Sequence, residues 1–118
     1  MISSDVLRGY NDTIILAILL KEDSYGYEIS KEIARRSNDV YAIKETTLYS
    51  AFNRLEKNGL VETYYGDKTN GKRRTYLKIT DAGRAYYCEK CSEWTLTKEL
   101  VDQFTSEEES TCQGENNE

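Results

Sequence analysis

The sequence contains no histidine and no proline, and only three of its 118 residues are cysteine. Without histidine, the usual serine and cysteine hydrolase arrangements and the histidine-based zinc sites cannot be built. The cysteines form one Cys88-x-x-Cys91 pair and a separate Cys112. A single pair is a weak metal signal, so we expect buried or half-buried thiols, with redox sensing and metal binding as the open alternatives. The sequence therefore predicts no catalytic residues, no metal and no cofactor.

Long hydrophobic runs are also missing. The longest, residues 14–20, is far shorter than the roughly 20 residues of a membrane-spanning helix. Polar residues precede it, which argues against a signal peptide. We expect a soluble cytoplasmic protein without membrane contact. Its hydrophobic content of 38% permits one small domain with an appendage, to which a partner subunit could add core.

Positive charge is scarce overall but concentrated in the middle of the chain. The net charge is −5, and residues 105–118 alone contain five glutamates and no cation, so the rest of the chain is neutral. Residues 44–84 contain nine Lys or Arg against five Asp or Glu. The acidic balance therefore belongs to the tail, and the basic middle suits a nucleic-acid partner.

The basic region begins with an amphipathic segment, residues 44–58, followed by Gly59. Its apolar residues recur at i, i+3, i+4 and i+7, the spacing of one buried helical stripe. Those residues are Leu48, Ala51, Phe52 and Leu55. Glycine after the last turn is typical of a helix end. The opposite face holds hydroxyls, an amide and cations, which suit phosphates and base edges in a major groove. This pattern predicts a DNA recognition helix.

A hairpin is predicted directly after this helix. Residues 60–65 and 75–79 are rich in β-branched and aromatic side chains, and Asn70-Gly71 between them is a strong hairpin signal. The turn region is basic, which an exposed solvated turn would also explain. Beside a recognition helix we interpret it as a wing whose cations reach phosphate or the minor groove. These cations are Lys68, Lys72, Arg73 and Arg74.

The remaining segments complete a mainly α (α+β) fold. Residues 10–20 predict a nearly all-apolar central helix, residues 25–36 an amphipathic one, and Thr80-Asp81 the start of a long helix. That last helix carries a near-heptad apolar seam, which a second copy would bury. The seam comprises Tyr87, Cys91, Trp94, Thr97, Val101 and Phe104. We therefore expect a winged helix-turn-helix domain over 1–79, a C-terminal dimerisation helix over 80–104 and a disordered acidic tail over 105–118.

Several short motifs stand in a specific order. They are Leu7-Arg8-Gly9, Tyr25-Gly26-Tyr27-Glu28-Ile29, Thr47-Leu48-Tyr49, the run 54–61, Gly71-Lys72-Arg73-Arg74-Thr75-Tyr76 and the run 79–84. Together they resemble the PadR family of bacterial transcriptional regulators, from about residue 6 to residue 100, and in particular the smaller subfamily with one C-terminal helix. The resemblance implies a homodimer on an inverted-repeat operator in double-stranded DNA. Such a protein is usually a repressor released by a phenolic acid or another small hydrophobic ligand.

The predicted DNA-binding set combines the residue pattern with this resemblance. The start of the recognition helix should contact bases, its later cations and the wing should contact phosphate, and the family's tyrosine pair adds one phosphate contact. The set is Tyr25, Tyr27, Lys44, Thr46, Thr47, Tyr49, Ser50, Asn53, Arg54, Lys57, Lys68, Lys72, Arg73 and Arg74. The chain departs from the family in having Ser50 where proline is common and Phe52 where leucine is common.

The resemblance also suggests a ligand site at the dimer seam, formed by Tyr87, Cys91, Trp94 and Val101. Trp94 resembles the tryptophan that lines a pore between subunits in drug-binding members, although packing at the seam is the favoured interpretation. Two other function classes remain. One is a winged helix that contacts protein without DNA specificity, which the pI of about 4.9 favours. The other is a thiol-disulfide enzyme, which the position of Cys88 inside a predicted helix opposes. The residues do not identify the operator, the effector or the regulated gene, and they do not separate repression from activation.

Overall fold

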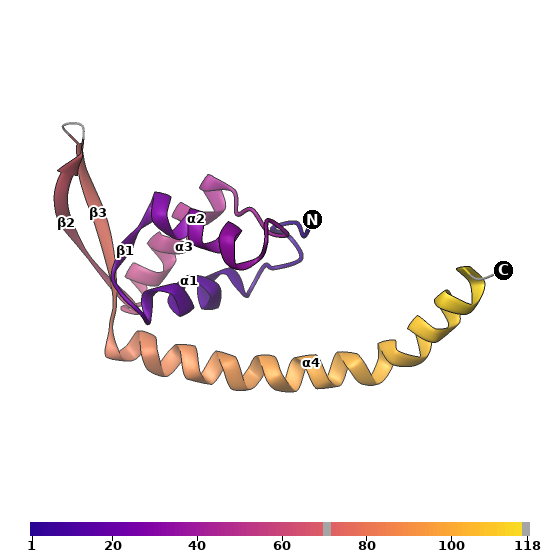
Figure 1. The fold of residues 1–118 in the computed structure, drawn as a ribbon. Helices are drawn as coiled ribbons and strands as arrows, with labels where there is room; N and C mark the ends of the chain where they lie inside the picture. The colour runs from indigo at the N-terminus through magenta and orange to yellow at the C-terminus, as the bar shows by residue number, and fades with distance from the viewer. Residues whose placement is uncertain (70–71, 117–118) are drawn as a thin grey trace. The chain divides into compact units, whose positions relative to one another are not determined.

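The structure, a computed structural model, describes the backbone of residues 1–69 and 72–116 and the side chains of residues 1–66 and 73–106. The elements follow one another as α1 (Asn11–Leu19), β1 (Ser24–Tyr25), α2 (Gly26–Arg36), α3 (Glu45–Lys57), β2 (Val61–Thr69), β3 (Lys72–Ile79) and α4 (Asp81–Asn116). Figure 1 shows α1, α2 and α3, then the hairpin of β2 and β3, and then the long helix α4. This order confirms the predicted winged helix-turn-helix fold.

The core lies between α1, α2 and α3, which all contact one another. Ile15, Leu16 and Leu19 of α1 are buried, so the most apolar helix is the central one, as predicted. The predicted stripe of α3 is buried in full. A single face of each helix therefore supplies the core, and the outer face of α3 remains open to solvent.

The connector between α2 and α3 sets the direction of the recognition helix. Asn38 and Asp39 adopt left-handed φ values of 52° and 63°, a conformation that these two residue types tolerate better than most. Beyond them Tyr41 is buried, and its hydroxyl donates a hydrogen bond of 2.6 Å to Oδ1 of the buried Asn11 in α1. This buried polar pair joins the connector to the central helix.

The end of α3 forms a Schellman motif. Gly59 has a φ of +74°, the Leu60 N–H donates to the Leu55 carbonyl at 2.9 Å, and the Gly59 N–H donates to the Glu56 carbonyl at 3.0 Å. Leu60 is buried in the core cluster. The glycine predicted to close the helix therefore also turns the chain directly into the wing.

The sheet has the order β1-β3-β2 and is antiparallel throughout. Val61 pairs with Ile79 and Tyr64 with Tyr76, which confirms the predicted hairpin. Its Asn70-Gly71 turn lies outside the described residues. The sequence did not predict β1, because two residues are too short to show an alternation.

Thr80 and α4 follow the wing. The Gly83 N–H donates to the Thr80 side-chain oxygen at 3.0 Å, which confirms the predicted cap, and the Thr80 hydroxyl donates to the Gly59 carbonyl at 2.7 Å. The chain divides into a unit of residues 1–87 and a unit of residues 88–118. Within the first unit, Tyr86 and Tyr87 of α4 pack against the core.

The long helix extends further than predicted. The sequence suggests an end near residue 104 and disorder from residue 105, whereas α4 continues to Asn116. The polar composition shows only that this segment has no apolar face to bury. Glutamate and glutamine nevertheless have good helix propensity, and no proline interrupts the run. The predicted domain boundaries at residues 79 and 104 stay predictions.

Candidate nucleic-acid interface

A groove of about 450 Å³ separates the recognition helix α3 from the wing. Residues predicted from three separate parts of the sequence line it: Tyr25 and Tyr27 at the start of α2, Tyr49 and Asn53 on α3, and Arg73 and Arg74 on β3. Glu56 and Thr63 complete this part of the lining, and the Thr63 hydroxyl donates to the Glu56 carboxylate at 2.7 Å. The fold thus brings together segments that lie far apart along the chain.

Tyr49 forms the floor where α3 meets α2. Its ring packs edge-on against Phe52 with centroids 5.3 Å apart. A Cβ atom on Gly26 would lie 2.5 Å from the Tyr49 hydroxyl oxygen, so only glycine leaves room for this ring at the start of α2. Tyr49 is still 49% exposed. It therefore joins the two helices and keeps a surface free for a ligand.

Three tyrosines support the base of the wing. Tyr64 stacks on its cross-strand partner Tyr76 at 5.5 Å, and Tyr25 of β1 meets Tyr76 edge-on at 5.3 Å. The Arg74 guanidinium lies 4.4 Å from the centre of the Tyr25 ring, and a hydrogen bond with Tyr76 raises the pKa of Arg74. This arrangement orients a predicted phosphate contact.

The base of the wing is also tied to the turn after α1. The Tyr64 hydroxyl donates a hydrogen bond of 2.6 Å to Oδ2 of Asp23. That bond, with a smaller effect from burial, raises the pKa of Tyr64 to about 12. Sequence analysis missed Tyr64, Tyr76 and Asp23, because their proximity depends on strand register and on β1.

The beginning of α3 faces a different groove, of about 540 Å³. Its lining joins Thr46, Thr47, Ser50 and Arg54 with Asn11 of α1 and with the segment before α1, which contributes Ser4, Asp5, Arg8 and Gly9. The motif Leu7-Arg8-Gly9 gave no sign in the sequence that it would lie beside the recognition helix. The predicted base-contacting hydroxyls thus lie next to the N-terminal segment.

Arg54 has a partner in the structure that the prediction did not include. We expected a cation available to phosphate. Its guanidinium donates two hydrogen bonds to the Asp12 carboxylate of α1, from Nε to Oδ2 at 2.9 Å and from Nη2 to Oδ1 at 2.5 Å. The bonds to Asp12 raise the pKa of Arg54. The two residues stand 42 positions apart, so no local pattern could reveal the pair.

Comparison with known proteins agrees with this geometry. Residues 15–89 match the model of the family described as "Transcriptional regulator PadR-like family". The chain belongs to the PadR-like family. Its members are transcriptional regulators and not enzymes. This PadR-family chain is accordingly a DNA-binding regulator, while its place in the smaller subfamily stays a prediction.

Solved structures and a curated relative are similar along most of the chain. A transcriptional regulator from Clostridium thermocellum is 59% identical with a TM-score of 0.81, covering 85% of this chain and 97% of that one. A PadR family transcription regulator from Clostridium difficile is 38% identical with a TM-score of 0.68, covering 80% and 97%. A protein of Lysinibacillus sphaericus named "Uncharacterized protein X" is 50% identical over 104 residues, covering 88% and 95%.

The predicted set also includes four lysines of this PadR-family chain. Lys44 is the exposed N-cap residue of α3, and Lys57 is its exposed last residue. The side chains of Lys68 and Lys72 lie outside the described residues. The fold thus places Lys44 and Lys57 at opposite ends of the recognition helix, and their contact with DNA stays a prediction.

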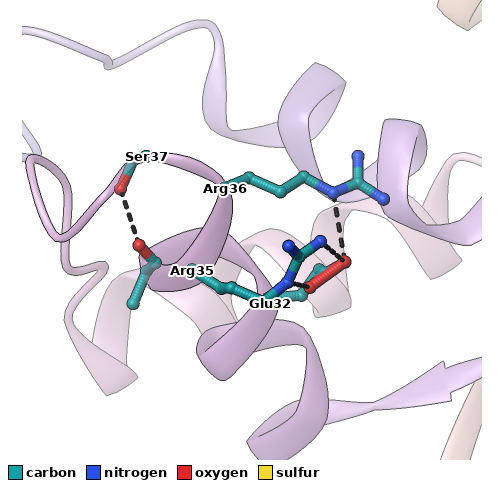
Figure 2. A network of polar contacts seen from close by, with 5 residues as sticks. Glu32, Arg35, Arg36 and Ser37 are labelled. Atoms are coloured by element: carbon teal, nitrogen blue, oxygen red, sulfur yellow. Dashed lines mark hydrogen bonds and ion pairs between the residues drawn. The ribbon is translucent and has the colours of Figure 1, made fainter.

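The end of α2 carries two further arginines that the prediction did not include. Figure 2 shows Arg35 and Arg36 converging on the Glu32 carboxylate. Arg35 donates to it at 2.5 and 2.9 Å and Arg36 at 3.1 Å. The pKa of Glu32 is lowered to about 2, and the hydrogen bond from Arg35 is the largest cause of this shift. This network partly neutralises the cations.

The predicted seam lies along α4. Tyr87 and Cys91 are half-buried, whereas Trp94 is 45% exposed and Val101 is also exposed. Cys88 is exposed, so the expectation of a buried or half-buried thiol is wrong for it and holds for Cys91. Cys112 has no described side chain.

Neither a metal site nor a membrane-spanning helix is present among the residues that the structure describes. Within that part of the chain, no three cysteine, aspartate or glutamate side chains gather in a way that could hold a metal ion. No helix there has both the length and the apolar character needed to cross a bilayer.

Proposed function

We propose that this PadR-family chain is a sequence-specific repressor that acts in the cytoplasm as a homodimer on an inverted-repeat operator. The observation that carries the proposal is the groove between α3 and the wing. Aromatic, amide and cationic side chains from α2, α3 and β3 line it together. A protein-contact module would not require arginines on a wing beside a recognition helix.

The two kinds of DNA contact fall on different parts of this surface. Hydroxyl and amide groups at the start and centre of α3 suit base edges, which carry sequence information. These are Thr46, Thr47, Tyr49, Ser50 and Asn53. Lys57, Arg73 and Arg74 supply phosphate contacts, which give affinity that falls steeply with salt.

Homodimer formation and effector release are assigned to α4. Its exposed side chains Trp94, Val101 and Phe104 would be covered by a second copy. Two recognition helices would then enter successive major grooves, about one DNA turn apart. A small hydrophobic or phenolic ligand at this seam releases the DNA only if it binds better to a dimer with a different spacing of the two heads.

The site assignment is tested with the double variant Tyr49→Ala, Arg74→Ala. Loss of one base contact and one phosphate contact should weaken binding to promoter DNA of its own gene by at least about tenfold. Fluorescence anisotropy at several salt concentrations measures both the affinity and its salt dependence. Glu89→Gln on α4 is the control, and circular dichroism confirms that each variant is folded.

Wild-type affinity in the double variant would remove the site assignment. If the wild-type protein shows no salt-dependent binding to promoter DNA, the protein-contact function replaces the proposal.

A further inference from the structure

Arg54 lies on the exposed side of the recognition helix, yet its charge is already compensated. The Asp12 carboxylate accepts two of its N–H groups, and the Asp12 side chain is only 16% exposed while that of Arg54 is 51% exposed. The carboxylate is therefore held in the body of the domain, on α1. The guanidinium extends from α3 to meet it.

This pair differs from the other ion pair beside the same groove. Arg8 and Asp5 are 81% and 84% exposed and lie three residues apart in the segment before α1. Such an exposed pair contributes little and exchanges readily. The Asp12–Arg54 pair is bidentate and joins two helices, which fixes the guanidinium in one geometry.

The arginines of the wing have partners of another kind. Arg74 lies over the Tyr25 ring and Arg73 lies 5.8 Å from the centre of the Tyr65 ring. An aromatic ring orients a guanidinium without cancelling its charge. The wing therefore presents full positive charges, whereas the groove at the start of α3 presents hydroxyls beside a neutral pair.

The bonds to Asp12 use two of the five N–H groups of the guanidinium, so a phosphate contact from Arg54 either shares the cation with the Asp12 carboxylate or breaks both bonds. In both cases the Asp12 carboxylate stands close to the phosphate and repels it. Phosphate contacts raise affinity for every DNA sequence equally and so add nothing to discrimination. When a cation is kept away from phosphate, non-specific binding to DNA becomes weaker and the base contacts are unchanged.

We infer that Asp12 is a specificity-determining residue of the DNA interface, which withholds Arg54 from the phosphate backbone. The inference rests on the DNA-binding function proposed above and deepens it. It assigns the salt-dependent affinity to the wing and to Lys44 and Lys57 at the two ends of α3. The start of α3 is left to sequence-dependent contacts.

The test uses a random-sequence DNA duplex, so it does not need the operator. Asp12→Asn keeps the shape of the side chain and frees one positive charge. It should bind the duplex several-fold more tightly, and the slope of log K against log salt should steepen by roughly 0.9 for each arginine released. Glu89→Gln on α4 changes the net charge equally and should leave the slope near that of the wild type.

A charge-matched variant gives the second measurement. Asp12→Asn combined with Arg54→Gln has the same net charge as the wild type but lacks the ion pair. If Arg54 is withheld, its salt slope on the random duplex equals the wild-type slope. Thermal unfolding of every variant shows whether loss of the pair affects folding. Should Asp12→Asn fail to fold, the double variant alone decides, because it leaves no uncompensated charge.

Two results overturn the inference. One is a slope for Asp12→Asn equal to that of Glu89→Gln, and the other is a shallower slope for the charge-matched variant than for the wild type. Either would show that Asp12 does not withhold Arg54 from DNA. Both are distinct from failure of the proposed function, in which the wild-type protein itself binds no duplex in a salt-dependent way.

Discussion

Gly26 and Tyr49 show how single residues set the recognition surface. The Tyr49 hydroxyl occupies the space that a side chain at position 26 would need. Tyr49 also packs on Phe52, whose ring is buried in the core. The position of this exposed tyrosine therefore depends on a glycine that itself makes no contact with DNA in the proposed function.

Gly26→Ala should displace Tyr49 outward without unfolding the protein. The colliding atom is the far end of a half-exposed side chain, so the free energy of unfolding should change by no more than about 1 kcal/mol. Binding to promoter DNA should weaken by about tenfold. Denaturant unfolding and fluorescence anisotropy measure the two effects.

As a control, Gly26→Ala is also made in a Tyr49→Phe variant, which lacks the colliding oxygen. There Gly26→Ala should cost less DNA affinity than it does in the wild type. If the two substitutions instead weaken binding additively, Gly26 does not act through Tyr49.

At the scale of single helices and strands, the periodicity of the sequence predicted the features that depend on the spacing of nearby residues. The stripe on α3 was identified because four apolar residues repeat at helical intervals, and Gly59 because a left-handed residue follows the last turn. The hairpin followed from its composition and its Asn-Gly turn. These features depend on neighbours within a few positions of the chain.

Features built from distant residues were beyond such patterns. Asp12 meets Arg54, Asp23 meets Tyr64 and Tyr41 meets Asn11 across separations of at least 30 residues. Each contact depends on the relative placement of elements that the sequence does not encode locally. As a result, the prediction included neither the Asp12 partner of Arg54 nor the support of the wing.

The attachment of the wing to the turn after α1 can be tested by a single substitution. Tyr64→Phe retains the ring that stacks on Tyr76 and removes the hydrogen bond to Asp23. The folded-state pKa of Tyr64, about 12, lies above its ordinary value of 10.0. The bond therefore stabilises the fold from neutral pH up to about 10, and this contribution is lost as the pH rises from 10 through 12.

The difference in unfolding free energy between wild type and Tyr64→Phe should thus stay constant from pH 7 to 9. It should shrink as the pH approaches 12, as urea unfolding at each pH would show. Tyr65→Phe is the control, since Tyr65 is exposed in the same strand. A constant difference up to pH 12 would contradict the assigned role of the Asp23 contact.

At the scale of the whole molecule, charge and apolar surface are divided between segments. The basic excess belongs to residues 44–84, which include α3 and the wing, and the acidic residues that offset it stand in the last part of the chain. Exposed apolar side chains collect on α4, namely Trp94, Leu96, Leu100, Val101 and Phe104. An amphipathic helix of this kind gains most of its stability from packing against another surface.

A second copy of the chain is the partner that the seam predicts. Val101 and Phe104 lie on the same side of the helix as Trp94 by their spacing, whereas Leu96 lies on another side. Val101→Asp combined with Phe104→Asp would bury uncompensated charges in a dimer, at a cost of about 3–5 kcal/mol. This weakens dimer formation by more than about a hundredfold.

Analytical ultracentrifugation at micromolar concentration should then find a dimer for the wild type and a monomer for Val101→Asp, Phe104→Asp. Leu96→Asp adds the same kind of charge to the same helix but off the seam, and it should remain dimeric. The monomeric variant should also lose affinity for an inverted repeat more than for a single half-site, because it no longer binds both halves together. If the wild type is a monomer, or if both variants stay dimeric, the seam is not the dimer interface of this PadR-family protein.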